Sequence, residues 1–368
     1  MKKRMTRLLA LLMAVAMLLT LGACGGTDDT TDTNTTPDNT TTTPEDNDSQ
    51  DTTGDSSYPQ ATWTAANVLA SDSVYGIALH KFADLIQEKS GGAITIEVYD
   101  AGSLGAEKEC MEGLQMGTVD FWVGSTATCS NFTDSQTIYD LPYLFQNAEI
   151  AREVLQGETC QGILDQMSEV SVKGLCYFEN GIYAIISKDP IETLDDMKGK
   201  KIRAIESNLQ TDTYAALGAT GVAIAWGDCY TSLQTGVCDG ISSTTVPNMY
   251  SAKFYEVGKY ITETNHGYSP CMFAMSQSLW DSLDSATQEL IMECANEARD
   301  YQYEQIDTML ETLQAEMEAD GVTFYEVGYC PEWAAACAPI YEKYVGTGEG
   351  QIDPELVEKI QQEAAAVA

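Results

Sequence analysis

Residues 75–102 read YGIALHKFADLIQEKSGGAITIEVYDAG, and this stretch decides the class of fold. In its first part, residues 75–92, apolar side chains recur at the spacing of an amphipathic helix. Two glycines end that pattern, as glycines commonly do at the C-terminus of a helix. The following residues, 93–102, alternate apolar and polar side chains, which is the period of a half-buried strand. The stretch therefore predicts a helix followed directly by a strand.

The same alternation of elements extends to both sides of this stretch. We expect a strand over 61–70, a helix over 106–117 and a strand over 118–126. Strands that alternate with helices of about 10–15 residues indicate βαβ units and a parallel sheet. Residues 61–126 therefore predict an α/β region.

A second series of the same kind lies further along the chain. Strand-like patterns cover 172–179, 182–188, 200–207, 221–226 and the end of 237–244, and helical patterns cover 193–199, 209–218 and 228–236. From residue 284 or 285 a helical pattern then runs to about residue 319. Typical globular helices have about 8–20 residues, so a single helix that crosses two domains would explain this length.

The 308 residues after residue 60 exceed what one hydrophobic core usually holds, so we expect two domains. Two α/β lobes with a cleft between them place ligands at the carboxyl ends of their strands. Arg203 lies close to such an end and is flanked by apolar residues, which aims a cation at the interior. Beyond residue 60 the sequence has only two other arginines, Arg152 and Arg299.

The N-terminus predicts export and a lipid anchor. Basic residues in 1–7 precede an apolar run over 8–21, which is the pattern of a signal peptide over 1–23 and is too short to span a membrane. The residues LGAC at 21–24 resemble a lipobox, so Cys24 is expected to carry lipid at the outer face of the cell membrane. An ordinary signal peptide with a chance cysteine is the alternative. Residues 24–60 are polar and predict a disordered tether.

Charge and cysteine content exclude several classes of protein. The formal net charge of −37 argues against nucleic acid and against adhesion to anionic lipid. Eleven cysteines occur without a CxxC motif and with only two histidines, which argues against a metal site. Most of these cysteines are expected to be free thiols, although local disulfides Cys229–Cys238 and Cys330–Cys337 stay open.

The chain carries no motif of a known catalytic site. It lacks GxSxG, GxxxxGK[ST], GxGxxG and HExxH, so we expect neither an enzyme nor a cofactor. His80 fits the pattern of its helix as a surface or core residue, and His266 lies in a loop that could line a site.

Four stretches resemble the solute receptors of TRAP (tripartite ATP-independent periplasmic) transporters of the DctP type. They are KFADLIQEKSGGAITIEVYDAGSLGAEKECMEGLQMGTVDF (81–121), LDDMKGKKIRAIES (194–207), LGATGVAIAWGDCYTSLQTGVCDG (217–240) and KFYEVGKYITETNH (253–266). The resemblance implies an α/β, two-lobed, periplasmic-binding-protein-like fold with a ligand cleft between the lobes and a long helix crossing both. It places lobe I at 61–180 plus about 270–308, and lobe II at 181–269 plus about 309–368.

The resemblance also implies the central contacts of the site. Arg203 matches the arginine that pairs with the ligand carboxylate, and a guanidinium offers the planar fork that this role needs. The alternative is a structural ion pair with a carboxylate such as Asp239. Trp226 matches an aromatic position that packs over the ligand; the alternative is an ordinary core position.

The resemblance implies further contacts at positions that match the family. Glu107 matches an acidic site position, although as a helix-start residue it could equally be a cap. Ser125 and Ser243 match polar contacts, but the chain has Ser-Ser-Thr where many relatives have Glu-Asn-Pro. Tyr183 falls where some relatives place a second arginine. The role of Glu206, close behind Arg203, stays open.

These residues imply a function. With one arginine for the cleft, we expect a receptor for a small organic acid, a monocarboxylate with an apolar body lined by Tyr183, Trp226 and Trp122. The receptor is expected to work as a monomer and to deliver its ligand to the membrane permease subunits of a TRAP transporter. A sensory receptor or an enzyme on the same two-lobed scaffold is the alternative.

Overall fold

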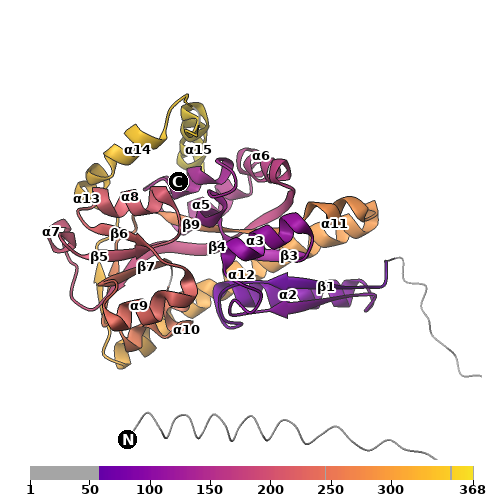
Figure 1. The fold of residues 1–368 in the computed structure, drawn as a ribbon, viewed down its shortest axis with the longest axis horizontal. Helices are drawn as coiled ribbons and strands as arrows, with labels where there is room; N and C mark the ends of the chain where they lie inside the picture. Colours follow the sequence, from indigo (N-terminus) through magenta and orange to yellow (C-terminus); the bar gives the residue numbers. More distant parts are fainter. Residues whose placement is uncertain (1–57, 245, 349, 368) are drawn as a thin grey trace, which may run out of the picture. The chain divides into compact units, whose positions relative to one another are not determined.

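The computed structural model describes residues 58–244, 246–348 and 350–367. The signal peptide expected at 1–23 and the lipidated Cys24 therefore lie outside the described residues, as does most of the tether. Ten strands of the described part form one mixed sheet with helices around it (Figure 1). The order along the main path is β2-β1-β3-β9-β4-β7-β5-β6, and β8 and β10 lie off this path.

The first lobe has the βαβ units that the opening stretch predicts. Its parallel strands and connecting helices are β1 (Ala61–Ala66), α2 (Val74–Lys89), β2 (Ile94–Tyr99), α3 (Glu107–Met116) and β3 (Phe121–Ser125). Strand β1 is shorter than expected, because the Asn67 side chain bonds Asp100 at 2.7 Å and accepts the Leu69 N–H at 2.8 Å. The chain turns there instead of continuing the strand, so residues 68–69 lie just beyond the carboxyl end of β1.

The second lobe repeats this arrangement. Its strands are β5 (Lys201–Ala204), β6 (Thr220–Ala223), β7 (Gly240–Thr244), β8 (Tyr260–Glu263) and β10 (Thr323–Glu326), and its helices are α7 (Leu194–Met197), α8 (Asn208–Ala216), α9 (Cys229–Thr235) and α10 (Val246–Ser251). Strand β5 pairs in parallel with β6 and β7. Gly236 ends α9 in the left-handed conformation, with φ of 80°.

Two long antiparallel strands, β4 (Val172–Ser187) and β9 (Tyr268–Ser276), join the two halves of the sheet. The sequence predicted two strands in place of β4, and this was wrong. Gly181 adopts φ of 116° at an irregularity of the ladder, so it bends the strand without ending it. The first part of β4 pairs with β9, and its last part pairs with β7 and β8. The sheet is therefore mixed and not parallel throughout.

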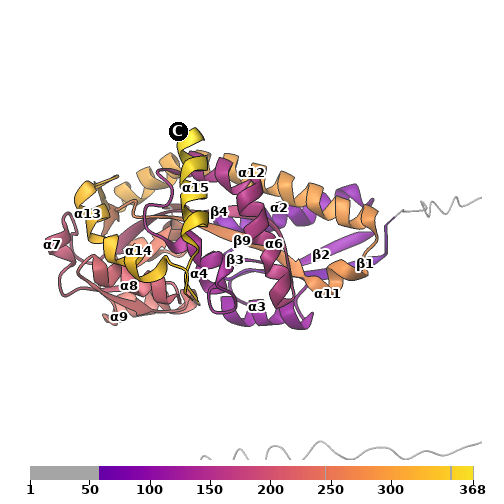
Figure 2. The ribbon, with the colours of Figure 1, turned by 90° about the horizontal axis from the view of Figure 1, so that it is seen from above.

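The long helix is α12 (Ser285–Ala319), with 35 residues, as the sequence predicts. It packs on α2 of the first lobe and on α10 of the second, so it crosses both lobes (Figure 2). Gln302 fixes its middle to β4: its side chain accepts the Glu179 N–H at 2.7 Å and donates to the Glu179 carbonyl at 3.0 Å.

The C-terminal helices divide between the lobes. Helix α13 (Pro331–Ala336) leads into α14 (Ala338–Tyr344), which packs on α8 of the second lobe, but α15 (Pro354–Val367) packs on α5 (Ala148–Leu155) and α6 (Glu158–Asp165). The expectation that residues 309–368 belong to lobe II therefore fails for α15. Its apolar side chains Val357, Ile360 and Ala364 complete a hydrophobic cluster of the first lobe.

The described part of the chain also shows the state of its cysteines and whether any of its helices could cross a membrane. Its ten cysteines are free thiols, nine of them buried, and neither local disulfide, Cys229–Cys238 or Cys330–Cys337, is formed. Among the residues that the structure describes, none of the helices combines the length and apolar character needed to cross a membrane.

Candidate ligand-binding site

A cavity of about 280 Å³ opens between the two lobes. Its walls come from the carboxyl ends of the parallel strands: β1, β2 and β3 on one side, and β5, β6 and β7 on the other. This is the edge at which open α/β sheets bind ligands. The volume lies just below the usual range for ligand pockets, about 300–1,000 Å³. Such a cavity suits a small molecule.

Arg203 enters the cavity from β5 and is only 4% exposed. Its Nε donates to the carbonyl of Ile224 at 2.8 Å, and its Nη1 donates to the carbonyl of Ser242 at 3.1 Å. Ile224 directly follows β6 and Ser242 lies within β7, the two strands that flank β5, so the sheet itself fixes the guanidinium. The thiol of Cys229 also hydrogen-bonds the guanidinium, and within the described residues no oxygen atom accepts a hydrogen bond from Nη2.

The charge of Arg203 has no paired counter-charge. No carboxylate of the described residues lies within 4.0 Å of it as an ion pair. The alternative partner, Asp239, instead accepts the backbone N–H of Lys201 at 2.8 Å. A buried cation without an ionic partner is costly, because carbonyl dipoles replace only part of its hydration. The positive charge of Arg203 is therefore left without a counter-charge among the described residues.

Trp226 follows β6 and lines the cavity beside Arg203. The Arg203 guanidinium carbon lies 5.8 Å from the centre of the indole ring, within the range of a cation–π contact. Trp226 also packs on Phe254, with ring centres 5.0 Å apart. The ring is half-buried and contacts the hydrophobic clusters of both lobes, so it is a wall of the cavity and not an ordinary core residue.

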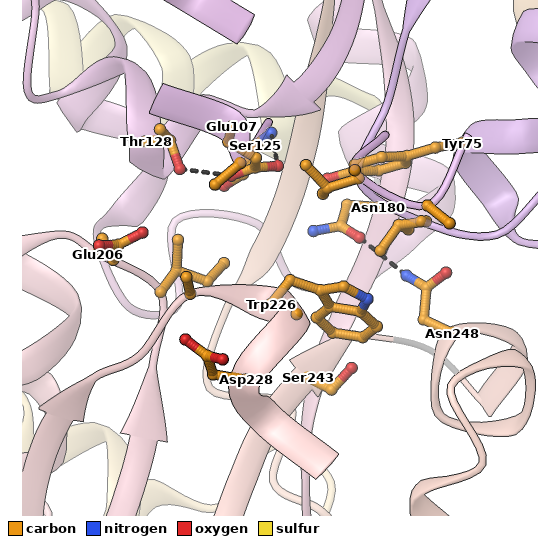
Figure 3. Close-up of a pocket in the computed structure, with 18 of the residues that line it drawn as sticks. Tyr75, Glu107, Ser125, Thr128, Asn180, Glu206, Trp226, Asp228, Ser243 and Asn248 are labelled. Carbon is orange, nitrogen blue, oxygen red and sulfur yellow. Dashed lines mark hydrogen bonds between the residues drawn. The ribbon is translucent and has the colours of Figure 1, made fainter. Parts of the chain in front are cut away.

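Glu107 lines the opposite wall, at the start of α3. It does not cap that helix: its carboxylate accepts the Ser125 N–H at 2.9 Å and the Thr128 hydroxyl at 2.5 Å. Burial raises the pKa of the Glu107 carboxyl, while the bonds from Thr128 and Ser125 and the charge of Arg203 act against that rise. Figure 3 shows this group above the cavity.

Ser125 and Ser243 complete the expected polar contacts. The Ser125 hydroxyl accepts the Ala127 N–H at 3.1 Å and begins the short helix α4 (Thr126–Cys129). The Ser243 hydroxyl lies on the floor of the cavity below Trp226 (Figure 3). Five of the six ligand contacts expected from the sequence thus line the cavity: Glu107, Ser125, Arg203, Trp226 and Ser243.

Tyr183 is the exception. Its ring is buried beneath the cavity, stacked 5.1 Å from His266, and its hydroxyl accepts Gln210 Nε2 at 2.9 Å. Trp122 is also absent from the lining, because it is fully buried in the core of the first lobe against Gly124. Strand periodicity explains both, since neighbouring side chains of a strand point to opposite faces.

His266 and His80 do not line the cavity either. The two ring nitrogens of His266 bond the hydroxyls of Thr264 at 2.7 Å and Tyr214 at 3.0 Å, and burial lowers the pKa of its imidazole to about 3. His80 is exposed and contacts Asp100 at 2.8 Å.

Several lining residues were not singled out from the sequence. Tyr75, Asn180 and Asn248 form one end of the cavity (Figure 3), and Asn248 donates to Asn180 at 2.9 Å. They come from α2, β4 and α10, so their convergence leaves no local motif. Asp228, at the start of α9, lines the other end together with Glu206. Its only signal in the sequence was its place at the start of the helix predicted over 228–236.

Two α/β lobes that face each other across a cavity, joined by strands and a helix that run through both, define a two-lobed solute-binding protein. The sequence matches the family "Bacterial extracellular solute-binding protein, family 7" (DctP) over residues 65–347, and the chain belongs to this family. The resemblance to TRAP solute receptors is thereby confirmed.

Characterised relatives differ in what they are named for binding. The C4-dicarboxylate-binding protein DctB of Bacillus subtilis (strain 168) is 31% identical over 303 residues, 81% of this chain and 86% of that protein. The 2,3-diketo-L-gulonate-binding periplasmic protein YiaO of Escherichia coli (strain K12) is 29% identical over 227 residues, 61% of this chain and 69% of that protein.

Solved structures agree with the fold. The sugar acid binding protein DctPAm of Advenella mimigardefordensis, in complex with galactonate, superimposes with a TM-score of 0.79 at 26% identity over 84% of this chain and all of that one. A TRAP periplasmic solute binding protein of Ochrobactrum anthropi gives 0.74 at 31% identity over 84% of this chain and 96% of that one. Both of these neighbours are named as binding proteins.

Proposed function

We propose that this protein is the extracytoplasmic receptor of a TRAP transporter and captures a small organic acid, whose carboxylate binds Arg203. The observation that carries the proposal is the buried guanidinium, whose Nη2 donates to no oxygen and which has no ion-pair partner among the described residues. A carboxylate bound there would receive charge-assisted hydrogen bonds, each contributing roughly 1.5–3 kcal/mol. Trp226, Ser125 and Ser243 would contact the body of the ligand.

The ligand we propose has one carboxylate. Among the described residues, Arg203 is the one positively charged side chain that lines the cavity. Glu107 and Glu206 line it as well, so a second ligand carboxylate would meet like charge without a cation to balance it. Some relatives are named for C4-dicarboxylates or sugar acids, but the single carboxylate proposed for this ligand follows from the residues that line this cavity.

Binding would close the two lobes around the ligand by a hinge motion. We propose that the lobes meet near residues 180–181 and 269–270, and within α12 near residue 308. In support, β4 exchanges β9 for β7 as its partner between Ile182 and Tyr183. The closed, ligand-bound form would then deliver the acid to the permease subunits in the membrane.

Native mass spectrometry of the purified protein, followed by denaturation and identification of the released compound, tests the proposal. We expect one small organic acid, recovered unaltered. Conversion of that acid to a product would favour the alternative, an enzyme on the same scaffold. A gene neighbourhood without two membrane subunits of a transporter would favour a sensory receptor.

The proposed anchor is lipid on Cys24, with the mature protein working as a monomer. Cys24→Ser is expected to abolish incorporation of labelled fatty acid and to shift the protein from the membrane fraction to the soluble fraction. Unchanged fractionation would refute the anchor. Light scattering after size exclusion tests the monomer, since a dimer mass would contradict it.

A further inference from the structure

We propose that the ligand is a zwitterion, a small acid that carries a cationic nitrogen such as an amino group in addition to its carboxylate. This rests on the proposed function and narrows it to a class of ligand. The inference comes from the balance of charge around the cavity. Among the described lining residues, one guanidinium faces three carboxylates: Glu107, Glu206 and Asp228.

The three carboxylates line one side of the cavity and come from both lobes. Glu107 belongs to the first lobe, and Glu206 and Asp228 belong to the second. Figure 3 shows Glu206 and Asp228 together at the left of the cavity, with Glu107 above. The groups also act on one another: the charge of Glu206 contributes to the raised pKa of Glu107.

None of these carboxylates has a cationic partner in the described part of the chain. Glu107 is bonded only by two neutral donors, the Ser125 N–H and the Thr128 hydroxyl. The side chains of Glu206 and Asp228 make no hydrogen bond to a described residue, and Glu206 is held through its backbone carbonyl, which accepts Asn131 Nδ2 at 2.9 Å. The negative side of the cavity is therefore as unpaired as Arg203 is.

A ligand with one negative charge satisfies only half of this arrangement. Its carboxylate would bind Arg203, but its body would lie among three acidic side chains, of which Glu107 is partly buried and therefore less screened by water. A zwitterion satisfies both halves, because an ammonium group donates hydrogen bonds to carboxylates while its own carboxylate binds Arg203. The face of Trp226 beside the cavity would add a cation–π contact.

The ammonium end of such a ligand would be bound by carboxylates of both lobes. Arg203, Glu206 and Asp228 come from the second lobe, whereas Glu107 lies across the cavity in the first. An ammonium group placed between Glu107 and Glu206 would therefore draw the lobes together. Without it, these two carboxylates would repel as the cleft narrows.

Matched pairs of probes test this inference, because each pair differs only in an amino group in place of a hydroxyl group. We would use phenylalanine with 3-phenyllactate, alanine with lactate, and 4-aminobutanoate with 4-hydroxybutanoate, and measure affinity by titration calorimetry on the full soluble chain. In at least one pair we expect the amino acid to bind about tenfold tighter or more, as expected for one charge-assisted hydrogen bond.

Variants of the carboxylates provide the second readout. Glu206→Gln and Glu107→Gln should weaken binding of the amino acid about tenfold and leave the matched hydroxy acid unchanged or bound more tightly. Glu206 is exposed, so its replacement leaves folding intact even if Glu107→Gln does not. Glu112→Gln is the matched control, because Glu112 is exposed on α3 outside the cavity; it should change neither affinity.

The outcomes separate this inference from the proposed function. The zwitterion is refuted if no amino acid of the panel binds, or if every hydroxy acid binds as tightly as its amino partner. It is also refuted if Glu206→Gln weakens both members of a pair equally. A hydroxy acid that binds as tightly as its amino partner and loses affinity in Arg203→Gln would refute the zwitterion and leave the organic-acid receptor standing.

Discussion

Arg203 and Arg152 both lie at cavities between the lobes, but their surroundings differ. Arg152 bonds Glu179 at 2.5 Å through Nε and Asp307 at 2.8 and 3.0 Å through its two terminal nitrogens, and it packs on the ring of Tyr303. Arg203 bonds two backbone carbonyls and has no ion-pair partner among the described residues. Arg152 lines a cavity of about 600 Å³ that is separate from the candidate ligand-binding site, and its two partners Glu179 and Asp307 line the same cavity.

The difference separates a structural arginine from a binding one. The charge of Arg152 is already balanced by the chain, and its fork is occupied on all sides. Carbonyls fix Arg203 without neutralising it, which leaves both charge and a donor for a ligand. Burial and an inward direction are common to both, so the partners decide which arginine can bind an anion.

Arg152→Met should give the largest effect, on stability. Glu179 is only 2% exposed, and removal of its cationic partner leaves a buried carboxylate unpaired. We expect the free energy of unfolding to fall by about 3–5 kcal/mol. Urea denaturation measures this change. The double variant Arg152→Met/Glu179→Gln should recover part of the loss, and an unchanged midpoint in the single variant would contradict the structural role.

Arg203→Met should behave in the opposite way. Removal of a buried cation without an ionic partner relieves an electrostatic cost, so the ligand-free protein should be as stable as the wild type or more stable by up to about 2 kcal/mol. The same urea denaturation, carried out without ligand, measures it. A loss of stability similar to that of Arg152→Met would mean that Arg203 holds the fold together.

The pH dependence of stability tests the buried polar groups beneath Arg203. Because the pKa of His266 is lowered to about 3, the unfolded chain takes up a proton there before the folded chain does. Stability should therefore be lost as pH falls below 6.5, by about 1.4 kcal/mol per pH unit for this group. The free energy of unfolding of the wild type should exceed that of His266→Asn by an amount that shrinks by about 1.4 kcal/mol per pH unit as pH falls. A difference that does not vary with pH would refute the neutral, buried imidazole.

Asp140 should act in the opposite direction. Burial raises the pKa of its carboxyl to about 6, although hydrogen bonds from Gln210 and Ser207 oppose the rise. The folded state then holds the proton more tightly, so this group adds stability as pH falls from about 6 to 4, again by about 1.4 kcal/mol per pH unit. Asp140→Asn should remove that gain in the same denaturation series. A gain that persists in the variant would exclude Asp140 as its source.

Tyr183→Phe should give the smallest effect. The hydroxyl accepts Gln210 Nε2, which also bonds Asp140 at 3.1 Å, so the donor keeps a partner. We expect a loss of about 1 kcal/mol in stability and no change in ligand affinity. Ser243→Ala, which removes a hydroxyl that lines the cavity, should show the reverse. If Tyr183→Phe weakens binding more than Ser243→Ala does, the ligand reaches deeper than the cavity described above.

Local patterns predicted much of this molecule. The helix over 75–92, the long helix α12 and the strand that carries Arg203 all follow from periodicity and flanking residues, which act at short range. The position of α15 on the first lobe depends on contacts between distant segments, and Gly181 marked a bend that resembled a strand end.

Some residues of the candidate site could likewise be predicted from the sequence, and others could not. Arg203 stood out because inward-facing cations are rare in this chain, and Trp226 because it matches an aromatic position of the family that the sequence resembles. The carboxylates of Glu206 and Asp228 did not stand out in so acidic a sequence, although the place of Glu206 behind Arg203 raised the question. Tyr75, Asn180 and Asn248 meet only in the folded protein.

The most direct test of the account is the affinity of Arg203→Gln for the acid that is released when the purified wild-type protein is denatured. Titration calorimetry on both proteins measures it. Since two charge-assisted hydrogen bonds would be lost, we predict binding weaker by about 100-fold or more, with the unfolding midpoint of the ligand-free variant unchanged or raised. Equal affinity of the two proteins for that acid would contradict the claim that Arg203 binds its carboxylate.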